Sequence, residues 1–324
     1  MPGLTWMNGR LVTEAEAVVP FLTAGLHYGM GVFEGIRCYD PPGGPAVFRL
    51  DDHVRRLLAS ARTLGFRDLP YDSEALTTAI HDTIAANELR ACYIRPLIYL
   101  AEGGMDLSVD SGRAHVGIAA WPWKDYHGHG TVEAGIRVNV SSYTRHHPNI
   151  MATRAKVSGN YVNSFLARTE SSRLGFDDAV LLDPEGYVAE CTGENLFVVR
   201  RGQIITPPAA GILEGITRES VITLARDAGI EVSEERLVRD HLYDADEVFL
   251  SGTAAEIVGV REVDFRTVGS GTVGPITRVV QQAFRQVVRG EHPRSEAWLE
   301  PVRSERAADQ YQTLGPRRDG PQTA

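Results

Sequence analysis

The sequence predicts a mixed α/β fold of the α+β kind, divided into two domains. With 324 residues, of which 43% are hydrophobic and 23% charged, the chain exceeds one typical domain and can bury a sizeable core. Stretches with helical spacing of apolar residues alternate with short runs of β-branched and aromatic residues. We expect a small α+β domain at 1–124, a linker at 125–135, a larger domain at 136–301 and a disordered tail at 302–324.

The first domain is expected to contain two helices between strands. AVFRL (46–50) has strand character, and the apolar spacing over 51–90 predicts two helices separated by a Gly-Phe-x-x-Leu-Pro break. ACYIRPLIYL (91–100) and HVGIAAWPW (115–123) are short and rich in β-branched and aromatic residues, which is typical of strands. The Gly- and His-rich stretch that follows is the predicted linker.

The second domain is predicted to consist mainly of hairpins. A strand at 136–145 is followed by two pairs of strand-like runs, each joined by a short turn. A helix and a further strand then complete the domain. These runs are AVLLD (179–183) with YVAEC (187–191), LFVVR (196–200) with QIITP (203–207), the helix TRESVITLARDAG (217–229) and the strand EVFLSG (247–252).

The bulk composition favours small ligands over macromolecular ones. A net charge of −9 and a pI near 5.6 argue against a nucleic-acid or anionic-membrane surface, which needs a basic excess. Cys38, Cys92 and Cys191 are odd in number and form no CxxC pair, so neither a disulfide framework nor a metal site is indicated. The N-terminus has no secretory pattern, and no run approaches the ~20 apolar residues of a membrane helix. We expect a cytoplasmic enzyme or binding protein.

Lysine chemistry separates two residues from the other basic positions. Of the 33 Lys and Arg residues, only Lys124 and Lys156 are lysines. Both residue types are cationic, but only the primary amine of lysine condenses with an aldehyde to form a Schiff base. Each lysine is either kept for amine chemistry or a chance surface residue, and composition alone favours neither interpretation.

The neighbours of Lys156 favour amine chemistry there. Small residues follow it, and the phenol of Tyr161 could contact a bound ring, although a packing role would also suit this tyrosine. A Schiff-base cofactor such as pyridoxal phosphate needs an acid that keeps its ring nitrogen protonated. Glu190 is a candidate. On the predicted interior strand of its hairpin an unpaired carboxylate would be costly, which favours a partner for it. The alternative places Glu190 on the solvent face of that strand.

Two stretches could bind a phosphate group through backbone N–H donors. Gly215, Ile216 and Thr217 precede the predicted helix, and Gly252 and Thr253 follow a predicted strand. Either alone is also an ordinary cap, but together they indicate a phosphate site. A dinucleotide site is rejected, because the glycines of LHYGMGVFEGIRCY are spaced G-x-G-x-x-x-G and no βαβ unit surrounds them.

Eight stretches together resemble the fold-type IV pyridoxal-phosphate enzymes, and most closely the bacterial branched-chain amino acid aminotransferases. They run in the family's order from about residue 5 to 300 and leave only the C-terminal tail uncovered. They are LHYGMGVFEGIRCY (26–39), FRLDDHVRRL (48–57), CYIRPLIY (92–99), AAWPW (119–123), AKVSGNY (155–161), ECTGENLF (190–197), GITRES (215–220) and EVFLSGTAAEI (247–257). The resemblance implies a small N-terminal α+β domain and a larger C-terminal domain with a β-barrel-like core and helices, with the cofactor between them.

The resemblance also implies roles at the cofactor. Lys156 matches the lysine that forms the internal aldimine and shuttles the proton between the substrate α-carbon and the cofactor C4′. Glu190 matches the carboxylate paired with the pyridine nitrogen, and Tyr161 the tyrosine near the phenolic oxygen. The other matching positions are Leu213 at the ring face and Arg56, Gly215, Ile216, Thr217, Gly252 and Thr253 at the phosphate.

The implied substrate pocket accepts both an aliphatic side chain and the γ-carboxylate of glutamate. Arg95 matches the group that meets the γ-carboxylate, although a structural ion pair is the alternative for it, as core packing is for Trp123. The remaining matches are Phe33, Trp123 and Tyr126 at the apolar walls, Tyr28 and Leu107 from a second subunit, and Tyr93, Thr253 and Ala254 at the α-carboxylate. The implied enzyme is therefore a homodimer or higher homo-oligomer.

One departure and several related activities bear on this prediction. Cys191 and Thr192 stand where many relatives carry Gly, Ser or Ala. D-amino acid aminotransferases tend to carry Arg-x-His where this chain has Arg95-Pro96-Leu97, and (R)-selective amine aminotransferases generally lack the Tyr93-x-Arg95 arrangement. The aliphatic and aromatic walls disfavour an aminodeoxychorismate lyase, and intact Lys156, Glu190 and Arg56 disfavour a silent binding protein. We expect reversible transamination between branched-chain L-amino acids (Leu, Ile, Val) and 2-oxoglutarate.

Overall fold

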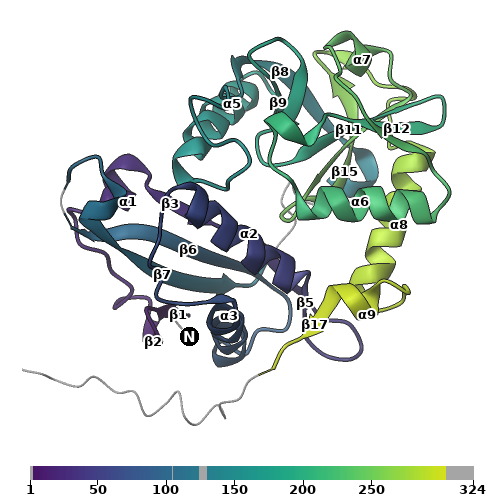
Figure 1. Cartoon of the computed structure of the whole chain (residues 1–324). Helices are drawn as coiled ribbons and strands as arrows, with labels where there is room; N and C mark the ends of the chain where they lie inside the picture. Colours follow the sequence, from purple (N-terminus) through teal and green to yellow (C-terminus); the bar gives the residue numbers. More distant parts are fainter. Residues whose placement is uncertain (1–2, 104, 124–129, 304–324) are drawn as a thin grey trace, which may run out of the picture.

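Two β-sheets with helices packed against them make up the chain (Figure 1). The computed structural model describes residues 3–103, 105–123 and 130–303. The first sheet has eight strands in the order β17-β5-β4-β6-β7-β1-β2, with β3 paired to β6. Its strands are β1 (Leu4–Met7), β2 (Arg10–Thr13), β3 (Gly31–Phe33), β4 (Ile36–Tyr39), β5 (Ala46–Phe48), β6 (Cys92–Gly103), β7 (Gly112–Trp121) and β17 (Leu299–Pro301).

Two long helices cover one face of this antiparallel sheet. In α2 (Leu50–Thr63) and α3 (Ser73–Ala86) apolar residues recur every three or four positions, which gives each helix one apolar face. Leu57 of α2 and Ile80 of α3 are fully buried in one hydrophobic cluster with Ile94 of β6. Burial of these side chains holds the helices on the sheet. A short helix, α1 (Ala24–Tyr28), precedes β3, and a 3₁₀ turn, η1 (Val109–Ser111), precedes β7.

The second sheet has nine strands in the order β10-β9-β8-β15-β14-β11-β12-β13, with β16 paired to β15. β8 runs parallel to β9 and β15, and β12 runs parallel to β13, whereas its other pairs are antiparallel. The strands are β8 (Ile136–Thr144), β9 (Asp178–Leu182), β10 (Val188–Cys191), β11 (Asn195–Arg200), β12 (Gln203–Thr206), β13 (Val232–Glu234), β14 (Glu247–Gly252), β15 (Glu256–Val263) and β16 (Arg266–Thr267).

The longer helices of this part are α5, α6 and α8, and a shared apolar core rich in aromatic residues joins α6 and α8 to the first sheet. Phe197 of β11 and Phe249 of β14 stack at 4.7 Å in a cluster that also contains Phe284 of α8 and Phe48 of β5. The two sheets therefore share buried apolar surface. The helical segments are α4 (Thr131–Ala134), η2 (Ser158–Asn160), α5 (Tyr161–Arg173), η3 (Ala209–Gly211), α6 (Ile216–Asp227), α7 (Asp240–Tyr243), α8 (Pro275–Val288) and α9 (Ser295–Trp298).

The chain returns to the first sheet after completing the second. α8 and α9 lead to β17, which pairs with β5 in antiparallel register, Leu299 opposite Phe48 (Figure 1). His81 of α3 and Glu300 of β17 lie 3.0 Å apart and add a polar link to this pairing. Within the described residues, no helix is both long and apolar enough to span a bilayer.

The predicted elements are confirmed, with one correction. The two helices within 51–90, the hairpins β9–β10 and β11–β12, the helix at α6 and the strand at β14 all form, and the fold class is confirmed. The strand of Glu190 is not interior to its sheet, since β10 ends the pairing order, but Glu190 is buried as expected and does not lie on a solvent face. The predicted linker falls partly, and the predicted tail mostly, outside the described residues.

Candidate active site

Lys156 is held by backbone hydrogen bonds to α2 and β3. Its backbone N–H donates to the Ser60 hydroxyl of α2 at 3.1 Å, and its carbonyl accepts from the N–H of Phe33 at 3.1 Å. The amine Nζ donates to the phenolic oxygen of Tyr161 at 2.7 Å and lies 5.1 Å from the centre of the Phe33 ring. Backbone bonds thus fix the position of Lys156, while a phenol and an aromatic ring orient its amine.

Glu190 is buried opposite this amine, in the same cavity. One carboxylate oxygen lies 2.7 Å from Nη2 of Arg145, and the other accepts from the N–H of Leu213 at 3.2 Å and from Nδ2 of Asn195 at 3.3 Å. Burial raises the pKa of Glu190, and Arg145 with the Leu213 N–H opposes that rise. Lys156, Tyr161, Glu190, Leu213 and Asn195 all line the cavity.

Asn195 connects the Glu190 end of the cavity to the start of α6. Its Nδ2 also donates to the carbonyl of Leu213 at 3.0 Å. Gly215 is the N-cap of α6, and a Cβ added there would come within 2.0 Å of Oδ1 of Asn195. Only glycine permits this approach, which sets the first turn of α6 beside the cavity. The first N–H groups of a helix lack intrahelical acceptors and attract anions.

Arg56 extends from α2 to the residues that directly precede α6. Its Nε and Nη2 donate to the two oxygens of Glu34 at 2.7 and 2.8 Å, and its Nη1 donates to the carbonyl of Glu214 at 2.7 Å. Glu34 is fully buried and also lies 2.8 Å from Nδ1 of His53. Burial alone would raise the pKa of Glu34, but Arg56 and His53 outweigh it and hold that pKa well below its usual range. The guanidinium is therefore fixed beside Gly215.

An aromatic and cationic cluster lies at the other side of Phe33. Nη2 of Arg95 donates to the hydroxyl of Tyr93 at 3.3 Å, and its guanidinium lies 4.6 Å from the centre of the Phe33 ring. Trp123 stacks on Tyr93 at 4.5 Å and donates from Nε1 to the carbonyl of Ala254 at 3.3 Å. This cluster offers a hydroxyl, a guanidinium and apolar walls on one face of the first sheet.

The glycines rejected as a dinucleotide motif have structural roles here. Gly29 has a φ of 68°, and a Cβ on it would come within 2.8 Å of Cα of Gly159. A Cβ on Gly35 would come within 1.9 Å of the Tyr93 hydroxyl. The stretch therefore packs tightly against the segment after Lys156 and leaves space for the Tyr93 side chain.

Two of the predicted substrate residues are not brought to this cluster within the chain. Tyr28 is 48% exposed and donates to the Met105 carbonyl at 3.2 Å, and Leu107 is 89% exposed. Tyr126, like Lys124, lies outside the described residues. Of the other predicted cofactor residues, Leu213 lines the cavity, Gly215, Ile216 and Thr217 stand at the start of α6, and Gly252 ends β14 with Thr253 directly after it.

Arg145, Glu34 and Asn195 are site residues that the sequence predictions missed. Glu34 and Asn195 lie inside quoted stretches, FEG and GENLF, but neither residue type has a chemistry that singles it out. Arg145 follows β8 in an otherwise polar run and carries no motif. The sequence indicated all three only indirectly: if Arg56 and Glu190 are buried, each needs a partner elsewhere in the chain.

The residues present fit pyridoxal phosphate. An amine for the aldehyde faces the same cavity as a buried carboxylate suited to the pyridine nitrogen, and the N-terminus of α6 with Arg56 suits the phosphate. This donor set matches the three functional groups of that cofactor and defines an amine-transfer site.

Comparisons with known proteins give the same class. The family model of amino-transferase class IV matches residues 31–263. A branched-chain-amino-acid aminotransferase of Pseudomonas aeruginosa is 45% identical over 91% of this chain and 96% of its own length, and one of Escherichia coli is 46% identical over 92% and 96%. The chain therefore belongs to the class IV aminotransferases, and among them to the branched-chain amino acid aminotransferases, as the resemblance predicted.

Solved structures agree at the level of the fold. The branched-chain amino acid aminotransferase of Escherichia coli superposes with a TM-score of 0.91 at 44% identity, covering 94% of this chain and 100% of the other. A branched-chain amino acid aminotransferase solved with pyridoxamine 5′-phosphate, from the source abbreviated T.th., gives a TM-score of 0.89 at 46% identity, with coverage of 94% and 99%. The predicted two-part fold of this family is thus confirmed.

Proposed function

We infer that this chain is a pyridoxal-phosphate-dependent branched-chain amino acid aminotransferase. It transfers the amino group of a branched-chain L-amino acid to 2-oxoglutarate, which gives a branched 2-oxo acid and L-glutamate, and the reaction runs in both directions. The observation that carries this inference is the pairing, in one cavity, of the amine of Lys156 with the buried carboxylate of Glu190. D-amino acid, amine and lyase activities are not favoured by the relatives at about 45% identity.

In this proposal each polar group at the cavity has one task. Bound pyridoxal phosphate supplies a protonated ring that accepts the electron pair left when the substrate α-carbon loses its proton. Lys156 would hold the cofactor through its carbonyl carbon and would move the proton between the substrate α-carbon and C4′. Glu190 holds the proton at the ring nitrogen, and the Tyr161 hydroxyl, 2.7 Å from Nζ, orients the amine and the phenolic oxygen. Leu213 packs against the ring face.

The phosphate would be held by a cation and by backbone and hydroxyl donors. Arg56 is already oriented by Glu34, so its side chain loses little conformational freedom when the anion binds. The N–H groups of Ile216 and Thr217 at the start of α6 complement a dianion, and we place the turn at Gly252 and Thr253 on its other side.

The substrate would lie between Phe33 and Trp123. We place its α-carboxylate at the Tyr93 hydroxyl and at Thr253 and Ala254, the latter bonded to Trp123. Arg95, over the Phe33 ring, would meet the γ-carboxylate of glutamate and turn away when an aliphatic side chain fills the pocket. Tyr126 and, from a second subunit, Tyr28 and Leu107 would complete the walls.

We propose a homodimer as the minimal assembly. Large apolar side chains are exposed near α1 and on α5, among them Phe21 at 76%, Phe165 at 74% and Leu107 at 89%. Both helices lie on the same side of the molecule (Figure 1). Apolar patches of this kind typically mark protein interfaces. The three free, buried cysteines support a reducing compartment, and we propose the cytoplasm.

The cofactor and substrate assignments can be tested together. Borohydride treatment of the yellow holoenzyme should link the cofactor covalently to Lys156, located by peptide mass spectrometry. Mixing the holoenzyme with L-leucine or L-glutamate should remove the absorbance of the bound cofactor, whereas D-alanine and (R)-1-phenylethylamine should act slowly. A colourless protein, or labelling at a residue other than Lys156, would disprove the cofactor site; rapid reaction with D-alanine but not L-leucine would disprove the substrate class.

A further inference from the structure

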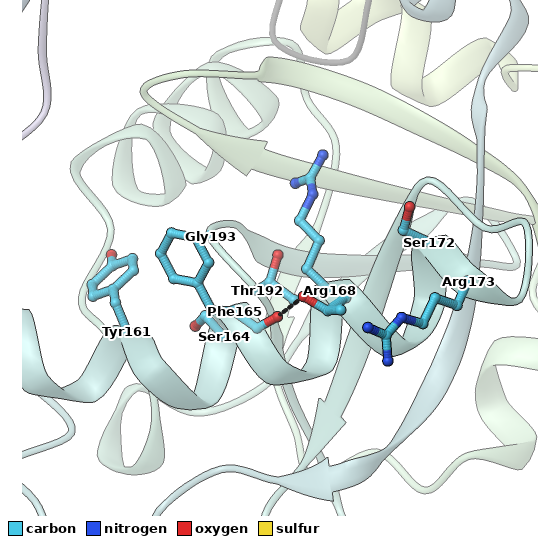
Figure 2. Close-up of a pocket in the computed structure, with 9 residues that line it drawn as sticks. Tyr161, Ser164, Phe165, Arg168, Ser172, Arg173, Thr192 and Gly193 are labelled. Atoms are coloured by element: carbon cyan, nitrogen blue, oxygen red, sulfur yellow. Dashed lines mark hydrogen bonds between the residues drawn. The ribbon is translucent and has the colours of Figure 1, made fainter.

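The turn from Cys191 to Glu194 separates two hollows of the molecule. On its inner side lies the cavity of Lys156 and Glu190, and on its outer side lies an open pocket along α5 (Figure 2). Thr192 and Gly193 of the turn line both hollows, as do Tyr161 and Ser164 of α5. The turn and the start of α5 therefore lie between the cofactor cavity and the outer pocket.

The buried carboxylate of Asp178 accepts hydrogen bonds that fix the Cys191–Glu194 turn. Oδ1 of Asp178, at the start of β9, accepts from the Thr192 hydroxyl at 2.6 Å, and its Oδ2 accepts from Nη1 of Arg168 at 3.1 Å. Asp178 is fully buried, whereas Arg168 is one-third exposed on α5 and reaches in from the outer pocket. Burial and the nearby Glu194 raise the pKa of Asp178, so its ionised form depends on these donors and on the Ala179 N–H.

The Cys191–Glu194 turn lies next to Glu190 on one side and next to Gly252 on the other. Cys191 directly follows Glu190, and its N–H donates to the carbonyl of Glu194 at 2.8 Å, which closes the turn. A Cβ on Gly252 would lie only 3.1 Å from the carbonyl oxygen of Gly193. Displacement of the turn would therefore shift the groups proposed for the ring nitrogen and for the phosphate at the same time.

We propose that Asp178 is a positioning residue that, with Arg168, holds Thr192 and keeps the Cys191–Glu194 turn closed. The amine-transfer chemistry does not require the side chains of Asp178, Arg168 or Thr192. Thr192 is also one of the two residues at which this chain departs from the family pattern. The consequence for the cofactor rests on the proposed role of Glu190. Opening of the turn would uncover Cys191, which is 2% exposed, and would speed the loss of cofactor.

Thiol labelling of the holoenzyme tests this proposal without measuring activity. Thr192→Val keeps the shape of the side chain but removes the hydroxyl donor to Asp178. Because one buried hydrogen bond is lost, we expect Cys191 to react with a maleimide about tenfold faster, and the cofactor to dissociate faster by a similar factor. Thr192→Ser should restore both rates, and the buried but distant Thr83→Val should change neither.

Cys38 and Cys92 serve as internal references, because both are buried in the first sheet. A parallel rise in the labelling of all three cysteines would mean global loosening and would overturn the proposal, as would an unchanged rate at Cys191. Faster labelling with unchanged cofactor release would refute the link to the cofactor. If Thr192→Val does not fold, Arg168→Gln, at a one-third exposed side chain, makes the same test from the outer pocket. A failed Lys156 or Glu190 assignment would leave the labelling result of the turn intact, so the two failures are distinguishable.

Discussion

At the scale of single residues, the site depends on two buried carboxylates with opposite pKa shifts. Glu34 has its pKa lowered by Arg56 and His53, so it stays ionised and fixes the guanidinium. Glu190 has its pKa raised by burial, with Arg145 as its main counter-charge. Glu190 has one fixed cation, Arg145, and its other oxygen accepts only neutral N–H donors, so it retains negative charge for a pyridinium nitrogen. Both oxygens of Glu34 bind Arg56, which suits a structural role.

Replacing Glu190 with glutamine tests the first of these roles. The amide cannot keep the ring nitrogen protonated, so we expect cofactor binding to remain largely in place while the half-reaction with L-leucine slows on the order of 100-fold. Stopped-flow loss of the cofactor absorbance measures this rate. Glu170→Gln, a carboxylate on α5 that binds Ser141 and Ser142 outside the cavity, is the matched control and should react like the unaltered enzyme. An unchanged rate in Glu190→Gln would remove Glu190 from the site.

Replacing Glu34 with glutamine tests the second role through stability. Because the folded-state pKa of Glu34 is depressed, its contribution is present above the usual pKa of 4.5 and is lost as the pH falls toward the folded-state value. We expect a loss of about 3 kcal/mol at pH 7 in urea unfolding, and a smaller loss at pH 4. Glu219→Gln breaks an exposed pair with Arg49 and should cost little at either pH. A loss that grows as the pH falls would contradict this assignment.

Residues with a distinctive chemistry could be predicted from the sequence, and their partners could not. Lys156 is recognisable because its amine has a unique reaction, and it lies close to Tyr161 in the chain. Arg145 and Asn195 are ordinary polar residues whose role arises only when β8 and β11 bring them to Glu190. Tertiary contacts between distant segments decide such roles, and local sequence does not encode them.

At the scale of elements, the N-terminus of α6 is positioned by a contact that only glycine allows. The backbone angles of Gly215, φ −70° and ψ 129°, suit any residue, so conformational freedom is not the reason for glycine there. The reason is the close approach of Asn195, which ties the start of α6 to the carboxylate of Glu190. The helix that would hold the phosphate is thereby set relative to the group that would hold the ring.

Gly215→Ala should therefore weaken cofactor binding. The added Cβ would push Asn195 and the first turn of α6 apart, and we expect the cofactor Kd to rise about tenfold or more. Equilibrium titration of the apoenzyme, followed by absorbance, gives this constant. Gly211→Ala, four residues earlier, is the matched control because no atom lies within 4 Å of its Cβ position. Equal Kd values for the two variants would refute the positioning role of Gly215.

The elements themselves were largely predictable, because hydrophobic periodicity and turn residues mark them locally. The hairpins β9–β10 and β11–β12 and the helices α2, α3 and α6 follow from such patterns. The position of β10 at the end of its sheet was not predictable, since strand order depends on parallel pairings such as β8 with β15, which join segments more than 100 residues apart. Likewise, nothing local indicates that β17 joins the first sheet.

At the scale of the whole molecule, one chain alone does not assemble every predicted substrate residue. Tyr28 and Leu107 belong to the first sheet's side of the molecule and are exposed, and Tyr28 reaches only the Met105 carbonyl. If both act in a partner's site, each active site consists of one subunit's Lys156 and the other subunit's Tyr28 and Leu107. Such sharing predicts that two inactive variants can restore each other's activity.

Mixed dimers of Lys156→Ala and the double variant Tyr28→Ala, Leu107→Ala test this sharing. In a mixed dimer, the subunit that keeps Lys156 receives an intact Tyr28 and Leu107 from its partner, so one of the two sites is complete. After unfolding and co-refolding at equal amounts, half of the dimers are mixed, and we expect about one quarter of the wild-type kcat/KM for L-leucine. Each variant refolded alone serves as the control. If Tyr28 and Leu107 acted within their own chain, every Lys156-bearing site would lack them, and mixing would restore no activity.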